Sequence, residues 1–334
     1  MFQKIAQTHE FIIALSIVIL SIGVGLINPA YFSVANLFDM LRNATIHSIF
    51  AMGVLVVLIS GGVDVSFPAI AAASSYIAVK LLIADGFQGP AWVVYLLALP
   101  FGLLLGMVNA TFISWFRLPA LIVTLGTASM IYGFVLFFVG NLTIYNLPAG
   151  LVSYRLMSLM TVNDPHAGTS SLHPSILLPV AAACGVWILL RYTLVGRGIY
   201  SMGGNREAAE RCGFNIRFIE YVIYGLTGVL ASIAGVTQVA LYRNANPAAL
   251  MGTELDVIAA VVLGGAAITG GRGTVIGAVL GVFLITLLKS SLILVGIPSE
   301  WQKVVVGIGL ILGASVAATR AARRNPTVAS NLVE

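Results

Sequence analysis

Long apolar runs separated by short polar segments make up most of this chain. A helix needs about 20 mostly apolar residues to cross a hydrocarbon core of about 30 Å, and these runs fit that requirement. They predict ten membrane-spanning helices, at residues 11–27, 44–60, 67–84, 91–114, 118–140, 174–191, 218–241, 254–268, 274–293 and 303–319. The run at 254–268 is the shortest, with Glu254 and Asp256 at its start. The pattern indicates an all-α integral membrane protein.

Two polar connections are much longer than the others, at 141–173 and at 192–217. We expect residues 1–334 to form a single transmembrane domain, with 141–173 as a long periplasmic loop and 192–217 as a long cytoplasmic loop. Ten spans arranged in this way suggest two halves of five helices, a plan that many transporters use.

The composition agrees with a lipid environment. Of the 334 residues, 59% are hydrophobic and 9% are charged, whereas a soluble domain carries roughly 25% charged residues. The net charge of +5 does not point to nucleic acid, because the basic residues lie in short breaks between apolar runs and form no basic face. The bilayer is therefore the expected partner of this surface.

The distribution of basic residues gives an orientation. With the N-terminus inside, eleven Lys and Arg residues fall on the cytoplasmic side and six on the outer side, as expected when cytoplasmic loops carry the excess. The loop 192–217 and the Arg-rich segment 320–324 both fall inside. We therefore expect a multi-pass protein of the bacterial inner membrane with both termini in the cytoplasm.

Several motifs of enzymes and of ATP-binding proteins are absent. The sequence contains no G-x-x-x-x-G-K-[ST] and no H-E-x-x-H, and its four histidines are scattered. His47, near the outer end of a span, is best interpreted as a packed or interfacial histidine. We expect no catalytic residue, no metal and no cofactor bound by this chain, and so no enzyme activity of its own.

A break rich in glycine separates the second and third predicted spans. It contains Gly61, Gly62, Asp64 and Ser66, and is followed by Phe67–Pro68. Non-helical backbone at membrane depth persists only where it contacts protein or a water-filled cavity. One interpretation is a tight inner turn in which Asp64 caps the third helix. The other is an element that lines a translocation path.

The cytoplasmic loop contains a short amphipathic helix, NREAAERCG, flanked by glycines. Asn205 suits the N-cap, Glu207 lies in the first turn, and Gly213 suits the C-terminal stop. Such a charged helix favours docking to a soluble partner, and the alternative is an ordinary solvated surface helix. Three GxxxG pairs, 102–106, 277–281 and 309–313, favour close helix packing inside the bundle.

Taken in order, these segments resemble the permease subunits of bacterial ATP-binding-cassette sugar importers, in the ribose/galactoside branch of the binding-protein-dependent family. The resemblance covers roughly residues 45–320. The matching positions are Gly204, Asn205, Glu207, Ala208, Ala209 and Gly213 in that family's coupling loop, Gly61, Gly62, Asp64 and Ser66 in its Gly-Gly-hydrophobic-Asp-hydrophobic-Ser signature, and segments 116–133, 254–265, 270–273 and 290–312. The chain departs from the family at Phe67–Pro68, where small residues are usual, and this leaves the substrate open.

The resemblance implies an importer with two permease subunits, two cytoplasmic ATP-binding subunits that hold ATP and Mg²⁺, and a periplasmic sugar-binding protein. The second permease subunit could be identical or a homologue. The expected cargo is a neutral sugar or a related polar solute, consistent with the few charges in the spans. The alternatives are an ion-coupled secondary transporter, whose candidate ion-binding charges would be Asp64, Glu220 and Asp256, and a non-transporting scaffold or receptor.

Overall fold

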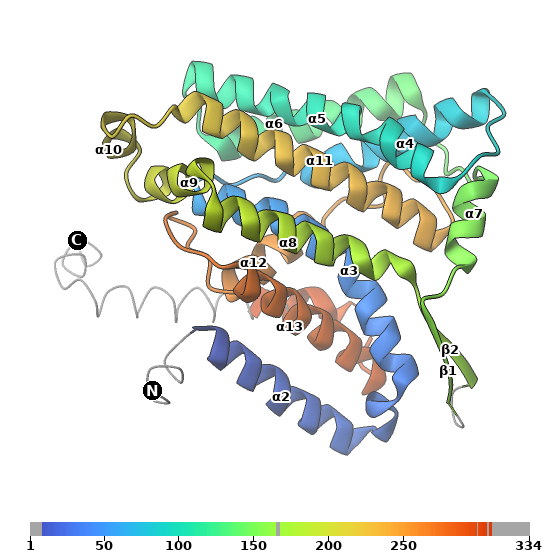
Figure 1. Cartoon of the computed structure of the whole chain (residues 1–334). Helices are drawn as coiled ribbons and strands as arrows, with labels where there is room; N and C mark the ends of the chain where they lie inside the picture. The colour runs from blue at the N-terminus through green and yellow to red at the C-terminus, as the bar shows by residue number, and fades with distance from the viewer. Residues whose placement is uncertain (1–8, 165–167, 299, 306, 309–334) are drawn as a thin grey trace.

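A computed structural model describes residues 9–164, 168–298, 300–305, 307 and 308 (Figure 1). Helices make up most of it, and its one sheet is a two-stranded antiparallel hairpin. The elements are α2 (His9–Ile27), η1 (Pro29–Phe32), α3 (Val34–Ile59), α4 (Phe67–Ala84), α5 (Ala91–Phe116), α6 (Ala120–Phe134), η2 (Val135–Val139), α7 (Ala149–Leu156), β1 (Met160–Asp164), β2 (Gly168–Leu172), η3 (Pro174–Ile176), α8 (Leu177–Tyr192), α9 (Leu194–Gly204), α10 (Arg206–Arg211), α11 (Ile216–Tyr242), α12 (Glu254–Leu263) and α13 (Val275–Leu294).

Eight helices in the described part of the chain are long and apolar enough to cross a membrane. They correspond to eight of the ten predicted spans, so the prediction of an all-α integral membrane protein is confirmed. One boundary differs clearly, because α3 begins at Val34, ten residues before the predicted start at 44. The predicted span 303–319 lies mostly outside the described residues, and the division into two five-helix halves stays a prediction.

The predicted span 254–268 is wrong as a full-length helix. Its helix, α12, has 10 residues and is about 15 Å long at 1.5 Å per residue, half the thickness of a hydrocarbon core. The segment before α12 pairs through Ala245 with Ile144 of the long loop, and the segment after it donates a hydrogen bond from Gly271 N to Ile59 O. This part of the chain therefore runs from one end of the bundle to the other as a half-length helix with irregular backbone on both sides.

Three helices form the centre of the bundle. At least 72% of the residues in the apolar stretches of α3, α4 and α11 are buried, whereas in α2, α5, α6 and α8 the buried share is 28% or less. Large apolar side chains cover these outer helices, among them Leu26, Trp92 and Phe137. Such a surface suits contact with lipid tails. The fold therefore encloses α3, α4 and α11 in a shell of lipid-facing helices.

Two of the GxxxG pairs pack helices against each other inside this chain. A Cβ atom at Gly102 would lie 2.3 Å from the carbonyl oxygen of Gly228, which brings α5 against α11. A Cβ atom at Gly281 would lie 1.9 Å from the carbonyl oxygen of Ala260, which brings α13 against α12. The interpretation of these glycines as intramolecular packing sites is thus confirmed. The pair 309–313 lies outside the described residues.

The bundle has two distinct ends (Figure 1). One carries α9 and α10, and we call it the α10 end. The opposite end carries α7 and the β1–β2 hairpin, and we call it the α7 end. The loop 192–217 therefore contributes two helices at the α10 end, and the loop 141–173 folds into a helix and a hairpin at the α7 end.

Candidate functional site

The short helix predicted around 205–213 is present as α10. Its N-cap is Asn205, whose side-chain Oδ1 accepts a hydrogen bond of 2.9 Å from Ala208 N. At the other end, Gly213 has φ +88°. Its N–H bonds to Glu210 O, and Phe214 N bonds to Ala209 O, which is the Schellman pattern that ends many helices. Both caps were predicted from residue type, and this local structure is confirmed.

Most of the predicted coupling residues face solvent. Gly204, Asn205, Glu207, Ala208 and Gly213 are exposed, while Ala209 is buried against the bundle. The side chain of Glu207 is 83% exposed and pairs loosely with Arg211, at 3.7 Å. An exposed ion pair of this kind contributes little to stability. The outer face of α10 is therefore polar, rigidly capped and free for contact.

A buried charge fastens α10 to the membrane bundle. Arg206, at the start of α10, forms an ion pair of 2.5 Å with Glu220 of α11, and the Glu220 side chain is 2% exposed. The second carboxylate oxygen, Oε2, has no hydrogen-bond partner among the described residues. Because an isolated buried carboxylate is unfavourable, Glu220 holds Arg206 in place. A movement of α10 would act directly on α11, a central helix.

Backbone contacts between glycines link the end of α9, the helix directly before α10, to two further segments. A Cβ atom at Gly203 would lie 1.8 Å from Ile59 O and 2.5 Å from Gly271 N, and Gly271 N itself donates to Ile59 O at 2.8 Å. Gly61 and Gly270 approach each other in the same place. The end of α3, the end of α9 and the loop after α12 therefore meet without intervening side chains. We call this contact of Ile59, Gly61, Gly203, Gly270 and Gly271 the glycine junction.

The break between α3 and α4 begins at this junction. Gly61 has φ +86°, its N–H bonds to Leu58 O, and Gly62 N bonds to Val57 O. This is again a Schellman pattern. The predicted helix break is confirmed, and its first glycine lies at the glycine junction.

Asp64 and Ser66 lie in a buried hydrogen-bond network. Oδ1 of Asp64 accepts bonds of 2.7 Å from both the N–H and the hydroxyl of Ser66. Asn109 of α5 donates to the Ser66 hydroxyl at 2.7 Å, and Thr124 of α6 contacts the backbone of Val63 and Val65 at 3.3 Å. The network thus ties the break to α5 and α6.

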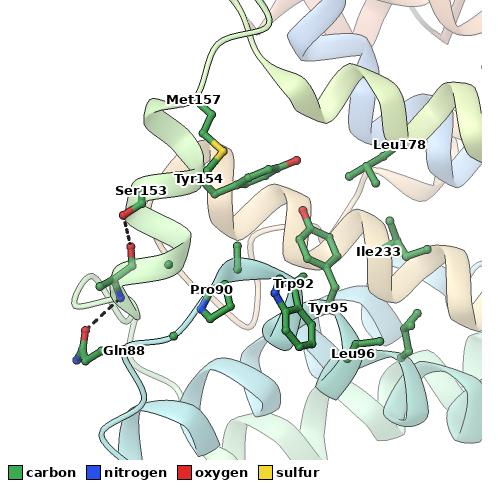
Figure 2. Close-up of a pocket in the computed structure, with 15 residues that line it drawn as sticks. Gln88, Pro90, Trp92, Tyr95, Leu96, Ser153, Tyr154, Met157, Leu178 and Ile233 are labelled. Carbon is green, nitrogen blue, oxygen red and sulfur yellow. Dashed lines mark hydrogen bonds between the residues drawn. The ribbon is translucent and has the colours of Figure 1, made fainter.

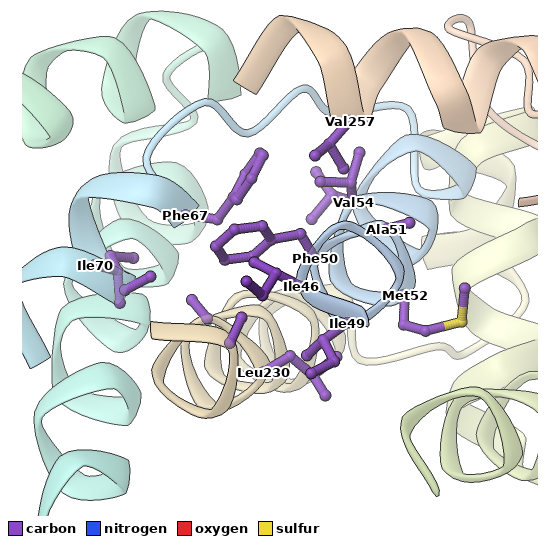
Figure 3. Close-up of a cluster of buried hydrophobic side chains, with 14 of the residues drawn as sticks. Ile46, Ile49, Phe50, Ala51, Met52, Val54, Phe67, Ile70, Leu230 and Val257 are labelled. Atoms are coloured by element: carbon purple, nitrogen blue, oxygen red, sulfur yellow. The ribbon is translucent and has the colours of Figure 1, made fainter. Parts of the chain in front are cut away.

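Two details of this segment differ from the sequence interpretation. Asp64 is not the cap of α4, since the N-cap position is Ser66 and makes no side-chain capping bond. Phe67 is 1% exposed and packs on Phe50 of α3, with ring centroids 4.8 Å apart (Figure 3). Pro68 does occupy the first turn of α4, as its fixed φ favours. Phe67 therefore fills the core in this structure.

A large cavity lies at the α7 end. It has a volume of about 890 Å³ between the start of α5, α7 and α8, and its wall is mainly apolar (Figure 2). Several of its polar groups already have partners, because Gln88 Oε1 accepts from Ala149 N, Ser153 donates to Ala149 O and Tyr95 bonds to Thr237. A polar ligand would find few free hydrogen-bonding groups there. Gly61, Gly62, Asp64 and Ser66 line neither this cavity nor a smaller one of about 220 Å³ among α3, α12 and α13.

No group of three or more His, Cys, Asp and Glu side chains is arranged to hold a metal within the described ranges. Two ion pairs, Arg206–Glu220 and Asp256–Lys289, are not evident from the sequence. In the sequence, Glu220 and Asp256 stand out as acids at the ends of spans and as candidate ion-binding charges. Their position next to apolar runs indicates that each acid needs a partner of opposite charge. The sequence does not show which residue that partner is.

Comparison with known proteins identifies relatives along most of the chain. A family model described as the permease component of branched-chain amino acid transport systems matches residues 36–314. The ribose import permease protein RbsC of Escherichia coli K12 is 29% identical over 302 residues, covering 90% of this chain and 91% of that protein. The autoinducer 2 import system permease protein LsrC of Escherichia coli K12/DH10B is 32% identical over 314 residues, covering 93% and 87%. LsrC of Shigella flexneri matches to the same extent.

Proposed function

This chain belongs to that permease family and is a transport subunit, and from this premise we propose that its cargo is a sugar or a sugar-like polar solute. The proposal follows the relatives, which import ribose and autoinducer 2. It places the chain in the bacterial inner membrane, within an importer driven by ATP. The multi-pass arrangement of eight spanning helices is consistent with that role.

The observation that carries the coupling proposal is the exposed face of α10. This helix projects from the bundle (Figure 1), its outer face is polar, and caps at Asn205 and Gly213 fix its shape. We propose that α10 docks on cytoplasmic ATP-binding subunits through the exposed residues Gly204, Asn205, Glu207, Ala208 and Gly213, while Ala209 packs the helix against the bundle. ATP and Mg²⁺ then bind to those subunits, and this chain binds no cofactor.

The attachments of α10 suggest how a movement reaches the membrane. The Arg206–Glu220 ion pair connects α10 to α11, and the glycine junction connects the preceding helix α9 to the end of α3. Since α3 and α11 form the bundle centre with α4, a shift of α10 would tilt the helices that surround the path. Gly61, Gly62, Asp64 and Ser66 lie beside the junction, and we assign this break to the inner gate of the path.

The same proposal orients the protein. Basic residues gather at the α10 end, including Arg117, Arg197, Arg211 and Arg272, which favours a cytoplasmic location. Both termini would then be cytoplasmic. The α7 end would face the periplasm and receive the substrate-binding protein. A second permease subunit, identical or homologous, completes the membrane part.

The test is transport by the assembled complex in proteoliposomes. Uptake should require ATP and the ATP-binding subunits, and should continue when ion gradients are collapsed by ionophores. Reporters fused near residue 155 and near residue 205 should label on opposite sides of the membrane. Uptake that persists without ATP while an ion gradient remains would establish the secondary transporter instead. No solute flux under either condition would point to a scaffold or receptor.

A further inference from the structure

The cavity at the α7 end lies in the side of the bundle and has no part in the coupling role of α10. Its volume of about 890 Å³ is within the range of small-molecule sites, about 300–1,000 Å³. Trp92 and Leu96 of α5 and Met157 after α7 line it and are exposed, whereas Ile233 of α11 lines it and is half-buried (Figure 2). The cavity therefore reaches from the outer surface to a central helix.

The lining residues follow one half of the membrane in depth. Trp92 is the second residue of α5, and Leu99 lies seven residues further on, about 10 Å deeper. Ile233 lies nine residues, or about 14 Å, before the end of α11. Half of a hydrocarbon core is about 15 Å thick. The cavity thus extends from the membrane interface nearly to the midplane, which is the depth that the lipid tails of one leaflet occupy.

The polarity of the wall changes along this depth. Gln88 and Ser153 lie near the interface together with Trp92, a residue type that is enriched at the level of lipid headgroups. The deeper wall is formed by leucines and by Ile233, and the hydroxyl of Tyr95 is already bonded to Thr237 at 3.1 Å. A wall that is polar at the interface and apolar below it matches the amphipathic structure of a lipid.

The cavity is also continuous with the lipid-facing surface of the protein. Two of the helices that line it, α5 and α8, belong to the exposed apolar shell. Leu96, on the lining, has 56% of its surface exposed on the same side of α5 as Trp92. A lipid tail can therefore enter sideways from the bilayer and needs no hydrogen-bonding group at the bottom of the cavity.

We propose that this cavity binds the hydrocarbon tail of one membrane lipid from the leaflet at the α7 end, with the headgroup at the level of Gln88 and Trp92. The volume has room for at least about thirty water-sized groups. A methylene group is about as large as a water molecule, so a whole tail fits. The tail covers Ile233 and the flank of α11, and it stays bound when the surrounding bilayer is replaced by detergent. The inference does not depend on the cargo of the permease.

The experiment uses Trp92 as a reporter inside the cavity. The full-length permease carries Trp115→Phe, Trp187→Phe and Trp301→Phe and is purified in excess dodecyl maltoside. Native mass spectrometry measures the lipid retained, and phosphatidylglycerol with brominated tails, which quench indole fluorescence on contact, is then titrated. We expect one retained lipid per permease, and quenching of Trp92 that saturates near one brominated lipid per permease. A permease with Trp187 as its single tryptophan, on the exposed side of α8, should show no saturable quenching.

Variants that fill the cavity provide the second comparison. Leu96→Phe with Ala149→Phe enlarges two exposed lining side chains. It should abolish the retained lipid and raise the lipid concentration for half-quenching about tenfold, equivalent to about 1.4 kcal/mol of binding. Leu104→Phe with Val108→Phe adds the same rings to exposed positions of α5 outside the cavity and should behave like the parent. Monodisperse yield checks that both variants are folded.

Three results would overturn the assignment. The first is neither retained lipid nor saturable quenching of Trp92, and, if the permease is then dimeric, the cavity belongs to the contact with the second subunit. The second is equal quenching of Trp92 and Trp187, which would mean ordinary contact with surrounding lipid. The third is retention and quenching that Leu96→Phe with Ala149→Phe leaves unchanged.

Discussion

The break after α3 and the end of α10 use the same local motif in opposite surroundings. Gly61 and Gly213 both have positive φ, at +86° and +88°, and both close a Schellman pattern. Beyond Gly61 the polar side chains of Asp64 and Ser66 point into a buried network, whereas beside Gly213 the side chain of Glu207 is 83% exposed. The first region is built to hold helices together, and the second leaves its polar groups available to a partner.

The largest effect should come from the glycine junction, where the first region contacts the end of α9, the helix before α10. Gly203→Val places a side chain 1.8 Å from Ile59 O, so backbone must move, and a cost at the exceptional level of about 4–5 kcal/mol is expected. We predict little folded protein, measured as monodisperse yield after detergent extraction. Gly204→Ala is the matched control, because a Cβ atom there meets nothing within 4 Å. Normal yield from Gly203→Val would refute the close contact.

Changes on the exposed face should affect coupling and leave folding nearly intact. Glu207→Arg reverses a charge near the positive end of α10. Gly213→Val forces a β-branched residue into a left-handed conformation at about 1–2 kcal/mol, with no steric clash at that position. Either variant should insert into the membrane and bind the substrate-binding protein, yet lose co-purification of the ATP-binding subunits and substrate-stimulated ATP hydrolysis.

Glu207→Gln is the control for this pair, since it removes the charge without reversing it and should keep most of the coupling. Wild-type co-purification and stimulated hydrolysis in both Glu207→Arg and Gly213→Val would show that α10 is not the coupling element.

Changes in the buried region should affect both stability and transport. Asp64→Ala removes the acceptor for two hydrogen bonds from Ser66, at about 1–3 kcal/mol for an orphaned buried donor. If this break is the inner gate, uptake per folded protein should fall as well. Asp64→Asn retains an acceptor oxygen and should recover most of the uptake. If uptake falls only in proportion to the yield of folded protein, Asp64 has a structural role and no role in the gate.

The smallest effect should be at the N-cap of α10. Asn205→Ala removes the hydrogen bond to Ala208 N and should cost about 1 kcal/mol, which corresponds to about fivefold faster hydrogen exchange of amides in α10. Asn215→Ala removes the corresponding cap of α11 and should leave exchange in α10 unchanged. Equal exchange in α10 for Asn205→Ala and the wild type would mean that contacts with the bundle, and not the cap, fix this helix.

The sequence was a good guide wherever structure depends on residue type over short distances. Apolar runs located eight spanning helices, and Asn205 and Gly213 revealed the ends of α10, because capping depends on the residue itself and on its immediate backbone. The glycine break at Gly61 followed from the same reasoning.

Features that depend on distant contacts could not be obtained in this way. Apolar composition alone did not show that α12 stops at Leu263, because a half-length helix and a short span have similar sequences. The pairing of Glu220 with Arg206, and of Asp256 with Lys289, depends on how helices pack. The hydrogen-bond network of Asp64 likewise reaches, through Ser66, to Asn109, a residue 45 positions away in the sequence.

The most direct test of the account is the chemical accessibility of Cys212 in the otherwise native chain. Cys212 is exposed at the C-cap of α10, and Cys184→Ser removes the other cysteine. The rate of labelling by a polar maleimide is compared between the permease alone and its complex with the ATP-binding subunits. Arg155→Cys, on α7 at the opposite end and made without Cys212, serves as the control. The account predicts that complex formation reduces labelling of Cys212 to near background and leaves the control unchanged. Equal labelling of Cys212 in the free permease and in the complex would contradict it.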